Sequence, residues 1–336
     1  MESDDDFGEL SHLDADGKPK IVERHLIVPP ELAGLRLDHF VKTQITRLSR
    51  TKIQTIIETQ LRRSDGHAPK PATIVAAGEH YVIRREAKPE PPCPRTFDVV
   101  HRDARVLVVD KPSGLPVHAS AKFYFNTLAR VLSERYPDEP ELQLCHRLDR
   151  ETSGCLVIAR DKQAAAFVKQ AIADKQRTTK QYLAVVHGQP PWDTEHELDA
   201  PLRLATEADG TKLVNVRVIA GDGGLVALTR VRVEARHGNY ALVRCTLVTG
   251  RQHQIRAHLA HAGFPIVGDK LYAHGDDAFI DYCDEGLTPE LAELFVLPRH
   301  ALHAARIVVP HPDGGEIAAE APLPADMVGL LDQPRR

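Results

Sequence analysis

The sequence predicts an α+β fold for the larger part of the chain. Short runs rich in β-forming residues are interspersed with helical stretches, but they do not alternate strictly with helices as the strands of a parallel sheet do. No loop of the form G-x-G-x-x-G or G-x-x-x-x-G-K-[ST] occurs, so a dinucleotide or nucleoside-triphosphate site is unsupported. The expected strands are residues 106–109, 154–159, 182–186, 225–233, 240–248 and 306–309, and the expected helices are residues 127–135 and 163–174.

A smaller α/β domain is predicted for residues 21–86. Four apolar residues at helical spacing indicate its first helix: Leu37, Phe40, Val41 and Ile45. Ser49 is a suitable N-cap for a second helix, whose buried stripe would consist of Ile53, Ile56 and Ile57. Strand-rich stretches at residues 73–75 and 80–83 complete this unit.

The domain boundary is predicted at residues 87–95, which hold four prolines in nine positions. Neither a helix nor a central strand tolerates this density of proline, so we expect a linker that leads into a larger domain at residues 96–325. Residues 1–20 carry seven acidic and two basic residues, a net charge of −5 that is typical of a solvated, disordered tail. A chain of 336 residues is long enough for two domains.

Charge is distributed unevenly along the chain. The formal net charge of −4 is unusual for a protein that binds nucleic acid through its phosphates. Residues 34–85, however, contain ten basic and four acidic residues, a net charge of +6. Arg47, Arg50 and Lys52 cluster at the start of the second predicted helix and in the loop before it. A basic segment of this size is typical of a nucleic-acid contact.

Cysteine usage and the N-terminal sequence predict the cellular compartment. The five cysteines include no C-x-x-C pair, which argues against a structural zinc site and against a disulfide framework, so we expect reduced thiols. The acidic start of the chain lacks the basic and apolar regions of a signal peptide. No apolar run approaches the roughly 18 residues of a membrane span. We therefore expect a cytoplasmic protein without a membrane partner.

Residues 145–161, CHRLDRETSGCLVIARD, form the most informative stretch. The polar run HRLDRETSG directly precedes the predicted strand 154–159, an arrangement that favours a site held on a rigid edge. Asp149 lies between Arg147 and Arg150. From composition alone, a structural salt-bridge loop and a functional site are about equally favoured.

Five ordered blocks of sequence resemble the RluA family of RNA pseudouridine synthases. They are DARVLVVDKPSGLPVH (103–118), HRLDRETSG (146–154), KQYLAVVHGQP (180–190), VTGRQHQIRAHLAHAGFPIVGDKLY (248–272) and RHALHAARIVVPHP (299–312). The basic domain, through LRLDHFVKTQITRLSRTKIQTIIETQ and TIVAAGEHYVI, resembles the small S-four-like RNA-binding domain often fused to these enzymes. The resemblance implies a catalytic core built on a mixed, mainly antiparallel β-sheet.

The same resemblance implies three catalytic residues. Asp149 matches the family's catalytic aspartate, which acts on the ribose or the base either as a nucleophile or as a base. Arg256 stands where the family places the arginine that pairs with this aspartate, so we expect an Asp149–Arg256 contact that keeps the carboxylate ionised in a closed pocket. Tyr182 matches the tyrosine whose ring would stack on the flipped uracil and whose hydroxyl could assist a late proton removal. Because the isomerisation involves no redox change and no energy input, no cofactor is expected.

Several basic and polar residues are expected to contact RNA. Arg147 matches the arginine that fills the gap in the RNA when the target nucleotide leaves its stack. Lys111 lies in a turn at the pocket rim and is expected to be either an ion-pair partner or an RNA contact. The expected RNA contacts are Lys111, His146, Arg147, Arg150, Arg251 and Gln254 of the large domain and Arg47, Arg50 and Lys52 of the small one.

Two rival functions follow from other features of the sequence. A metal-dependent hydrolase would need the histidines at positions 253, 258 and 261, but only the last two share a helix face and no acidic ligand accompanies them. We expect structural or RNA-contacting roles for these histidines and no bound metal. The acidic residues of 273–297 are expected to form a solvated loop and short helix. A non-catalytic RNA-binding or ribosome-assembly protein on the same fold would keep Asp149 only as a structural residue.

The RNA substrate is the least defined part of the sequence-based hypothesis. Ribosomal RNA is favoured because a separate basic RNA-binding domain suits a large folded substrate. Transfer RNA is the alternative substrate, and the sequence predicts no particular oligomeric state.

Overall fold

The computed structural model of the chain describes residues 7–9, 11–46, 48–120, 122–174 and 177–332. The chain divides into two compact units. The large unit comprises Met1–Gly8 and Pro91–Arg336, and the small unit comprises Glu9–Glu90. The second division point therefore lies within the proline-rich segment 87–95. Among the described residues, no helix has both the length and the apolar character needed to cross a bilayer.

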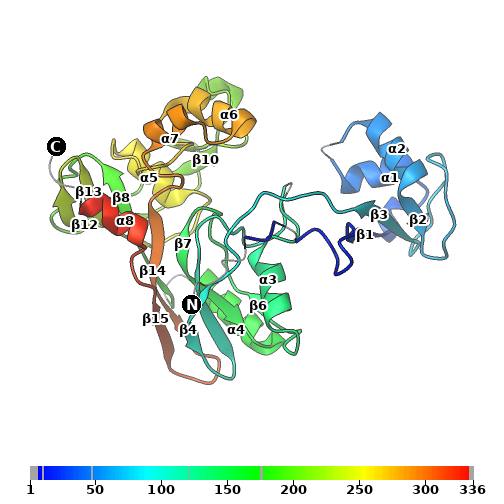
Figure 1. Ribbon diagram of the computed structural model, residues 1–336, viewed down its shortest axis with the longest axis horizontal. Coiled ribbons are helices and arrows are strands. Elements are labelled where there is room, and N and C mark those ends of the chain that lie inside the picture. The colour runs from blue at the N-terminus through cyan, green and yellow to red at the C-terminus, as the bar shows by residue number, and fades with distance from the viewer. Residues whose placement is uncertain (1–6, 10, 47, 121, 175–176, 333–336) are drawn as a thin grey trace. The chain divides into compact units, whose positions relative to one another are not determined.

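The small unit is a three-stranded antiparallel sheet with two α-helices (Figure 1). Its strands follow the order β1-β3-β2, and apolar side chains of both helices and the sheet share one core. The Ser49 hydroxyl accepts a hydrogen bond from the Lys52 amide, which confirms the predicted N-cap. The elements are β1 (Ile21–Ile27), η1 (Pro30–Leu32), α1 (Leu37–Gln44), α2 (Arg50–Thr59), β2 (Leu61–Arg63) and β3 (His80–Glu86).

Two segments of the small unit differ from the sequence-based expectation. Residues 73–75 do not form a strand and contribute only an isolated bridge between Ile74 and Arg36. Residues 11–20 lie in the expected disordered tail, but they form a turn closed by a bridge between Leu13 and Pro19. The Asp14 carboxylate accepts hydrogen bonds from the amides of Asp16 and Lys18, at 3.0 and 2.9 Å. An aspartate that caps its own turn in this way orders the backbone despite the acidic composition.

The large unit is built on a ten-stranded mixed sheet in which antiparallel pairs predominate. The strand order is β4-β5-β7-β14-β8-β13-β12-β9, with β15 paired to β14 and β6 paired to β7. The strands of this sheet are β4 (Asp98–Arg102), β5 (Val106–Lys111), β6 (Gln143–Leu144), β7 (Ser153–Ala159), β8 (Thr179–His187), β9 (His196–Leu198), β12 (Thr229–His237), β13 (Tyr240–Leu247), β14 (Leu302–Pro310) and β15 (Glu316–Glu320).

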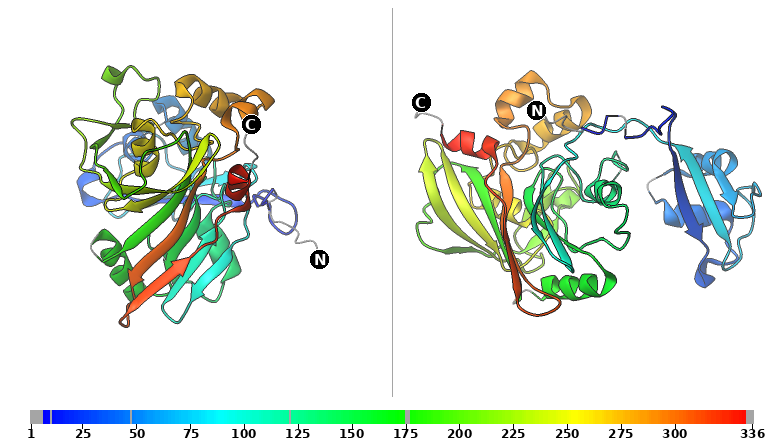
Figure 2. Two further views of the ribbon diagram at one scale, coloured as in Figure 1. Left: turned by 90° about the vertical axis from the view of Figure 1, so that its left-hand side faces the viewer. Right: turned by 60° about the horizontal axis from the view of Figure 1, so that its bottom comes forward.

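Helices and a small second sheet complete the large unit. Helix α4 packs against β7 and β14, and helix α8 packs against β13 (Figures 1 and 2). Strands β10 and β11 form a separate antiparallel pair. These elements are α3 (Leu128–Arg135), α4 (Lys162–Ala173), β10 (Leu202–Leu204), η2 (Glu207–Asp209), β11 (Val218–Ala220), α5 (Gln254–His261), α6 (Gly275–Glu285), α7 (Pro289–Phe295) and α8 (Ala325–Leu331).

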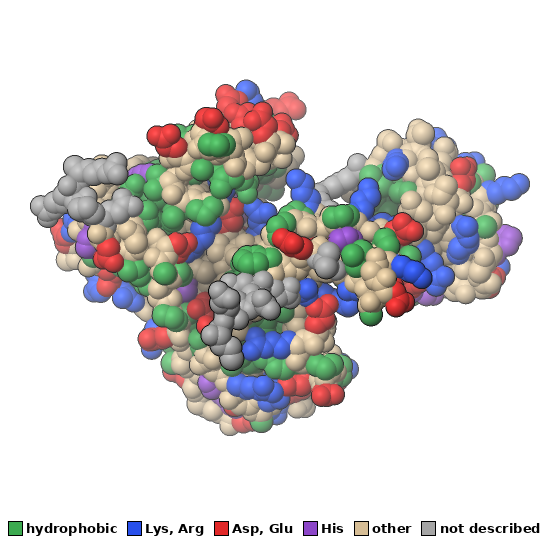
Figure 3. All heavy atoms as spheres, viewed as in Figure 1, with side chains coloured by type: hydrophobic (Ala, Val, Ile, Leu, Met, Phe, Trp, Pro, Cys, Tyr) green, Lys and Arg blue, Asp and Glu red, His purple; other side chains and the backbone are tan. Residues whose placement is uncertain are grey.

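The predicted elements of the large unit occur where expected, with two corrections. The strand expected at 225–233 begins only at Thr229, because Leu225 pairs with Leu202 of the small sheet instead. The acidic stretch 273–297 contains two helices, α6 and α7, rather than one short helix in a loop. Figure 3 shows acidic side chains gathered over these helices.

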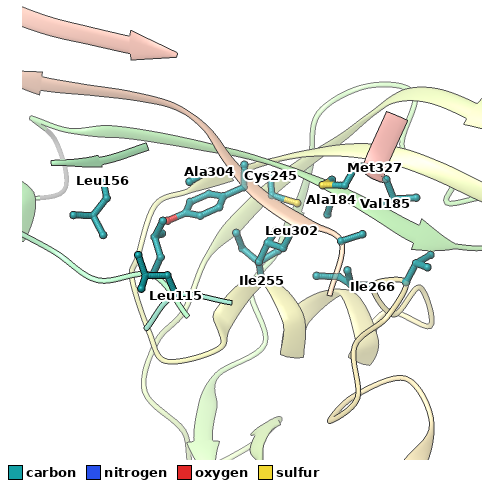
Figure 4. Close-up of a cluster of buried hydrophobic side chains, with 14 of the residues drawn as sticks. Leu115, Leu156, Ala184, Val185, Cys245, Ile255, Ile266, Leu302, Ala304 and Met327 are labelled. Atoms are coloured by element: carbon teal, nitrogen blue, oxygen red, sulfur yellow. The ribbon is translucent and has the colours of Figure 1, made fainter. Parts of the chain in front are cut away.

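Strand β7 is the centre of the large unit because both of its faces are buried. Leu156 and Ile158 belong to one apolar cluster, and Val157 belongs to a second cluster on the opposite face. Figure 4 shows the first cluster, in which Leu156 is joined by Leu302 of β14 and Ile255 of α5. The loop before β7 therefore starts from a rigid edge, as the sequence predicted.

Strands β7 and β14 run parallel and approach each other closely at Gly154. This residue has φ of +110°, and a Cβ atom here would lie 2.4 Å from the carbonyl oxygen of Ala304. The parallel pairing covers only two residue pairs, Ser153 with His303 and Gly154 with Ala304. The glycine is thus required by contact as well as by backbone conformation.

We expect Gly154→Ala to destabilise the protein far more than Gly314→Ala. Gly314 has a similar φ of +103° but no atom within 4 Å of its would-be Cβ, so its substitution adds strain alone, about 1–2 kcal/mol. The added clash at Gly154 should raise the loss above about 4 kcal/mol. Thermal unfolding of both variants measures the difference, and equal shifts in melting temperature would contradict the close packing of β7 on β14.

Candidate active site

A pocket of about 470 Å³ opens beside the loop that precedes β7. Loop residues 146–149, the start of β8, the loop between β13 and α5, and the first turn of α5 surround it. Its volume lies within the range of roughly 300–1,000 Å³ found for small-ligand sites. Asp149, Tyr182 and Arg256 all line it, so the structure brings together the three residues that the sequence predicted as catalytic.

The buried guanidinium of Arg256 links two carboxylates. Its Nε and Nη2 donate to the two oxygens of Asp269, at 2.7 and 2.9 Å. Its Nη1 donates to Asp149 Oδ2 at 3.0 Å, which confirms the predicted Asp149–Arg256 contact. Asp269 is fully buried, whereas the side chain of Asp149 keeps 27% of its surface exposed. Asp269 therefore orients the arginine, and Asp149 presents its carboxylate to the pocket.

The charge state of Asp149 follows from a balance between burial and nearby cations. Burial alone would raise the pKa of this carboxyl group and is the largest single effect, but the charge of Arg256, the smaller effects of His253 and His300, and the hydrogen bond from Arg256 together outweigh it. The pKa of Asp149 consequently lies below its ordinary value, and the group is ionised at neutral pH.

Lys111 holds the loop that carries Asp149 through hydrogen bonds from its buried ammonium group. The ammonium group of Lys111 donates to the carbonyl oxygens of Pro112, Leu115 and Arg150, at 2.7, 2.9 and 3.2 Å. The side chain is fully buried and does not line the pocket. The structure thus places Lys111 where RNA cannot reach it, and among the described residues no acidic side chain forms an ion pair with it, in contrast to both sequence-based expectations.

Glu151 anchors the same loop from the other side. Lys270 donates to both of its carboxylate oxygens, at 3.0 and 2.9 Å, and the amide of His300 donates to Oε2 at 3.2 Å. Arg150 also donates to Glu151, at 3.1 Å, and to the hydroxyl of Tyr282 at 3.3 Å. Arg150 is therefore engaged with α6 and does not line the pocket, although the sequence predicted an RNA contact.

Tyr182 lies on β8, where it pairs with Cys245 of β13. Its side chain is almost entirely buried, and burial together with the charge of Asp149 raises the pKa of its hydroxyl. The ring borders the same pocket as Asp149. Stacking on a base and hydrogen bonding through the neutral hydroxyl are both compatible with this position.

His146 and Arg147 line the pocket in different ways. The His146 ring accepts a hydrogen bond from the Val157 amide at 3.1 Å, so this side chain supports the start of the loop on β7. Arg147 is exposed, and within the described part of the chain its guanidinium has no hydrogen-bond or ion-pair partner. Of the two, Arg147 is the residue free to contact a ligand.

Gln254 and Arg251 belong to the loop between β13 and α5. The Gln254 amide donates to Leu228 and Thr229 and accepts from Thr249 and the Arg251 amide, at 2.7–3.0 Å. Its hydrogen-bonding capacity is thus used within the protein, which makes it a support for the loop. Arg251 is exposed at the pocket and donates to the Val226 carbonyl at 3.1 Å.

Two of the three expected RNA contacts of the small unit, Arg50 and Lys52, lie in the first turn of α2. Arg47 is outside the described residues. Arg50 is largely exposed and donates to the buried carboxylate of Asp38 at 3.3 Å. The Lys52 side chain is exposed.

Two important residues were missed by the sequence analysis. Asp269 orients Arg256. It belongs to GDKLY, the end of the matched block 248–272, but nothing in the sequence distinguishes it from the other residues of that block. Lys180 lies two residues before Tyr182 on β8 and lines the pocket, and burial lowers its pKa to about 8. Among the described residues no carboxylate pairs with Lys180, so a cation is available inside the pocket.

His258, one of the three histidines of the metal hypothesis, is engaged within the protein. His258 uses both ring nitrogens, one with the Thr229 hydroxyl and one with the Ala200 carbonyl, each at 2.9 Å. Within the described ranges, no group of three or more histidine, cysteine, aspartate or glutamate side chains is placed to hold a metal ion.

Comparison with known sequences points to one enzyme family. Residues 105–261 match the family model described as RNA pseudouridylate synthase. A protein of Xanthomonas campestris named ribosomal large subunit pseudouridine synthase D is 35% identical over 317 residues, which cover 92% of this chain and 91% of the relative. Ribosomal large subunit pseudouridine synthase C of Escherichia coli is 33% identical over 316 residues, covering 90% and 94% of the two chains.

Comparison with solved structures agrees with this result. Human RNA pseudouridylate synthase domain containing 1 superposes with a TM-score of 0.53 at 26% identity, over 69% of this chain and 86% of the human one. The shared fold is the mixed, mainly antiparallel sheet described above, which confirms the predicted fold class. The extent of these similarities, together with a pocket that contains the ionised Asp149, shows that the chain belongs to the RluA family of RNA pseudouridine synthases.

Proposed function

We propose that this protein isomerises specific uridines of ribosomal RNA to pseudouridine in the cytoplasm, with Asp149 as the catalytic carboxylate. The observation that carries the proposal is the ionised Asp149 side chain, which is exposed to a pocket and held by the buried Arg256. Ribosomal RNA is the proposed substrate because relatives similar over about nine-tenths of the chain are named for the large ribosomal subunit.

The chemistry requires few groups from the protein. The bond from ribose C1′ to uracil N1 breaks, the base turns, and a bond forms from C1′ to the ring carbon C5. The proton lost from C5 is balanced by the one gained at N1, so no electrons and no cofactor are consumed. Asp149 acts on the ribose or the base as a nucleophile or as a general base, and both actions need the ionised form that Arg256 maintains.

The remaining pocket residues suit an extruded uridine. The Tyr182 ring offers a face on which uracil can stack, and bases flipped from RNA are commonly held in this way. Arg147 and Arg251 are exposed at the pocket and can contact phosphates or fill the vacated position in the RNA. The S-four-like unit contributes Arg50 and Lys52 as sequence-independent phosphate contacts.

Deletion of the gene should remove pseudouridine from defined positions of ribosomal RNA. Chemical mapping of pseudouridine in total RNA, with and without the gene, identifies these positions. We expect the wild-type gene to restore them and Asp149→Asn to restore none, because the amide is neither a nucleophile nor a base here. Loss confined to transfer RNA would replace the proposed substrate, and restoration by Asp149→Asn would contradict the catalytic role.

Replacement of Arg256 should change the pH dependence of the reaction. Arg256→Gln removes the charge that lowers the pKa of Asp149, so the pKa rises and the carboxylate is protonated at a higher pH. We expect the acid limb of the single-turnover rate to move to higher pH, with activity reduced about 10²–10⁴-fold near neutrality. Arg256→Lys keeps the charge and should shift the limb less. An equal loss at every pH would show that Arg256 acts through geometry alone.

Lys52→Ala should weaken RNA binding without changing the chemical step. One lost phosphate contact lowers the slope of log affinity against log salt by about 0.7–0.9. Lys162→Ala is the matched control, since Lys162 is a largely exposed lysine of the other unit that is paired with Glu141. Filter binding across a salt series measures both variants, and identical slopes for the two would argue against an RNA contact at Lys52.

A further inference from the structure

His253 occupies an unusual position at the start of α5. Its backbone is left-handed, with φ of +52°, although it is not a glycine. Its side chain lines the pocket together with Asp149, and the mechanism proposed above assigns it no role. A strained residue of this kind persists where the surrounding structure holds it, and such residues cluster at functional sites.

A hydrogen-bonded chain orients the His253 ring. The Val218 amide donates to the Tyr272 hydroxyl at 3.0 Å, and this hydroxyl lies 3.1 Å from Nδ1 of His253. Tyr272 is buried, and among the described residues Nδ1 is the acceptor within reach of its hydroxyl proton. The tyrosine therefore donates to Nδ1, which leaves the proton of the neutral ring on Nε2.

The ring stays neutral at the pH of the cytoplasm. Burial and, to a smaller extent, the charge of Arg256 lower the pKa of His253, Asp149 opposes both effects, and the resulting pKa is about 4. Tyr272 is itself held in place, because its ring lies against the guanidinium of Arg256 at 5.1 Å. His253 thus presents one N–H group in a fixed direction.

The separation of His253 and Asp149 fits one additional oxygen atom. Nε2 lies 3.9 Å from Asp149 Oδ2, which is too long for a direct hydrogen bond. An oxygen placed about 2.8 Å from each atom bridges this gap with ordinary hydrogen-bond lengths. Such an oxygen must accept from Nε2–H and donate to a carboxylate, and a hydroxyl group does both.

We propose that His253 donates from Nε2 to the 2′-hydroxyl of the target ribose, which in turn donates to Asp149. This inference rests on the proposed function, since it places the ribose of the target uridine at Asp149. The ribose stays attached to the RNA backbone while the base turns, so a rigid donor can keep contact with it throughout the reaction. His253 then positions the sugar against the carboxylate and makes the site selective for ribonucleotides.

Two substitutions separate this role from a structural one. His253→Asn retains an amide near Tyr272 and a residue type that tolerates the left-handed backbone, but its side chain is too short to reach the 2′-hydroxyl. His253→Gln places an amide N–H near the position of Nε2. We expect His253→Asn to slow single-turnover isomerisation by roughly tenfold or more, and His253→Gln to recover most of this loss.

The decisive comparison uses an RNA fragment with a single 2′-deoxyuridine at the mapped target position. Wild-type protein should convert this fragment roughly tenfold more slowly than the all-ribose fragment, and His253→Asn should cause no further loss on it. Thermal unfolding and RNA affinity of both variants serve as controls for folding and docking. An equal slowing by His253→Asn on the ribose and deoxyribose fragments overturns the inference, as does an unchanged rate on the ribose fragment.

The two proposals are tested by different readouts. Conversion of the all-ribose ribosomal fragment by the wild-type protein tests the choice of RNA. The ratio of ribose to deoxyribose rates, compared between wild type and His253→Asn, tests the 2′-hydroxyl contact on whichever RNA the mapping identifies.

Discussion

The site depends on one buried cation, the guanidinium of Arg256, shared between two carboxylates of unequal exposure. Asp269 is fully enclosed and occupies two of the arginine's donors, which leaves a third donor aimed at Asp149. Breaking a buried ion pair by removing one partner costs about 3–5 kcal/mol, because the other charge is left uncompensated. Arg256 and Asp269 therefore stabilise each other in the folded state, and Asp149 gains its ionised state from an arrangement that the fold already maintains.

The second constraint is the convergence of distant segments on the loop that carries Asp149. Lys111 holds the loop from the end of β5, and Lys270 and the His300 amide hold Glu151 from beyond α5. The Thr152 hydroxyl lies 2.7 Å from the His300 ring. These groups come from both sides of the central strand β7, so the core of the unit holds the Asp149 carboxylate in a fixed position.

Sequence analysis predicted the fold class, most elements and the Asp149–Arg256 contact, because each has a local pattern or an ordered motif. It could not assign side chains whose direction depends on tertiary structure. Lys111 and Gln254 are polar residues within matched blocks. In the structure, however, Lys111 is buried and donates to the backbone of its own loop, and the Gln254 amide donates to Thr229 of β12. Asp269 and Tyr272 gave no separate signal, since their partners are brought near only by folding. The strand expected from residue 225 begins later because Leu225 pairs with Leu202 of the small sheet.

The position of β14 in the sheet has a consequence for the order in which the protein is made and becomes active. This strand, at residues 302–310, lies between β7 and β8, which occur far earlier in the chain. During synthesis the two halves of the sheet have no strand between them until β14 emerges, and until then Thr152 and Ser153 lack their histidine partners. A nascent chain on the ribosome consequently holds an unfinished pocket, and competence to modify RNA arises only once this late strand has been inserted.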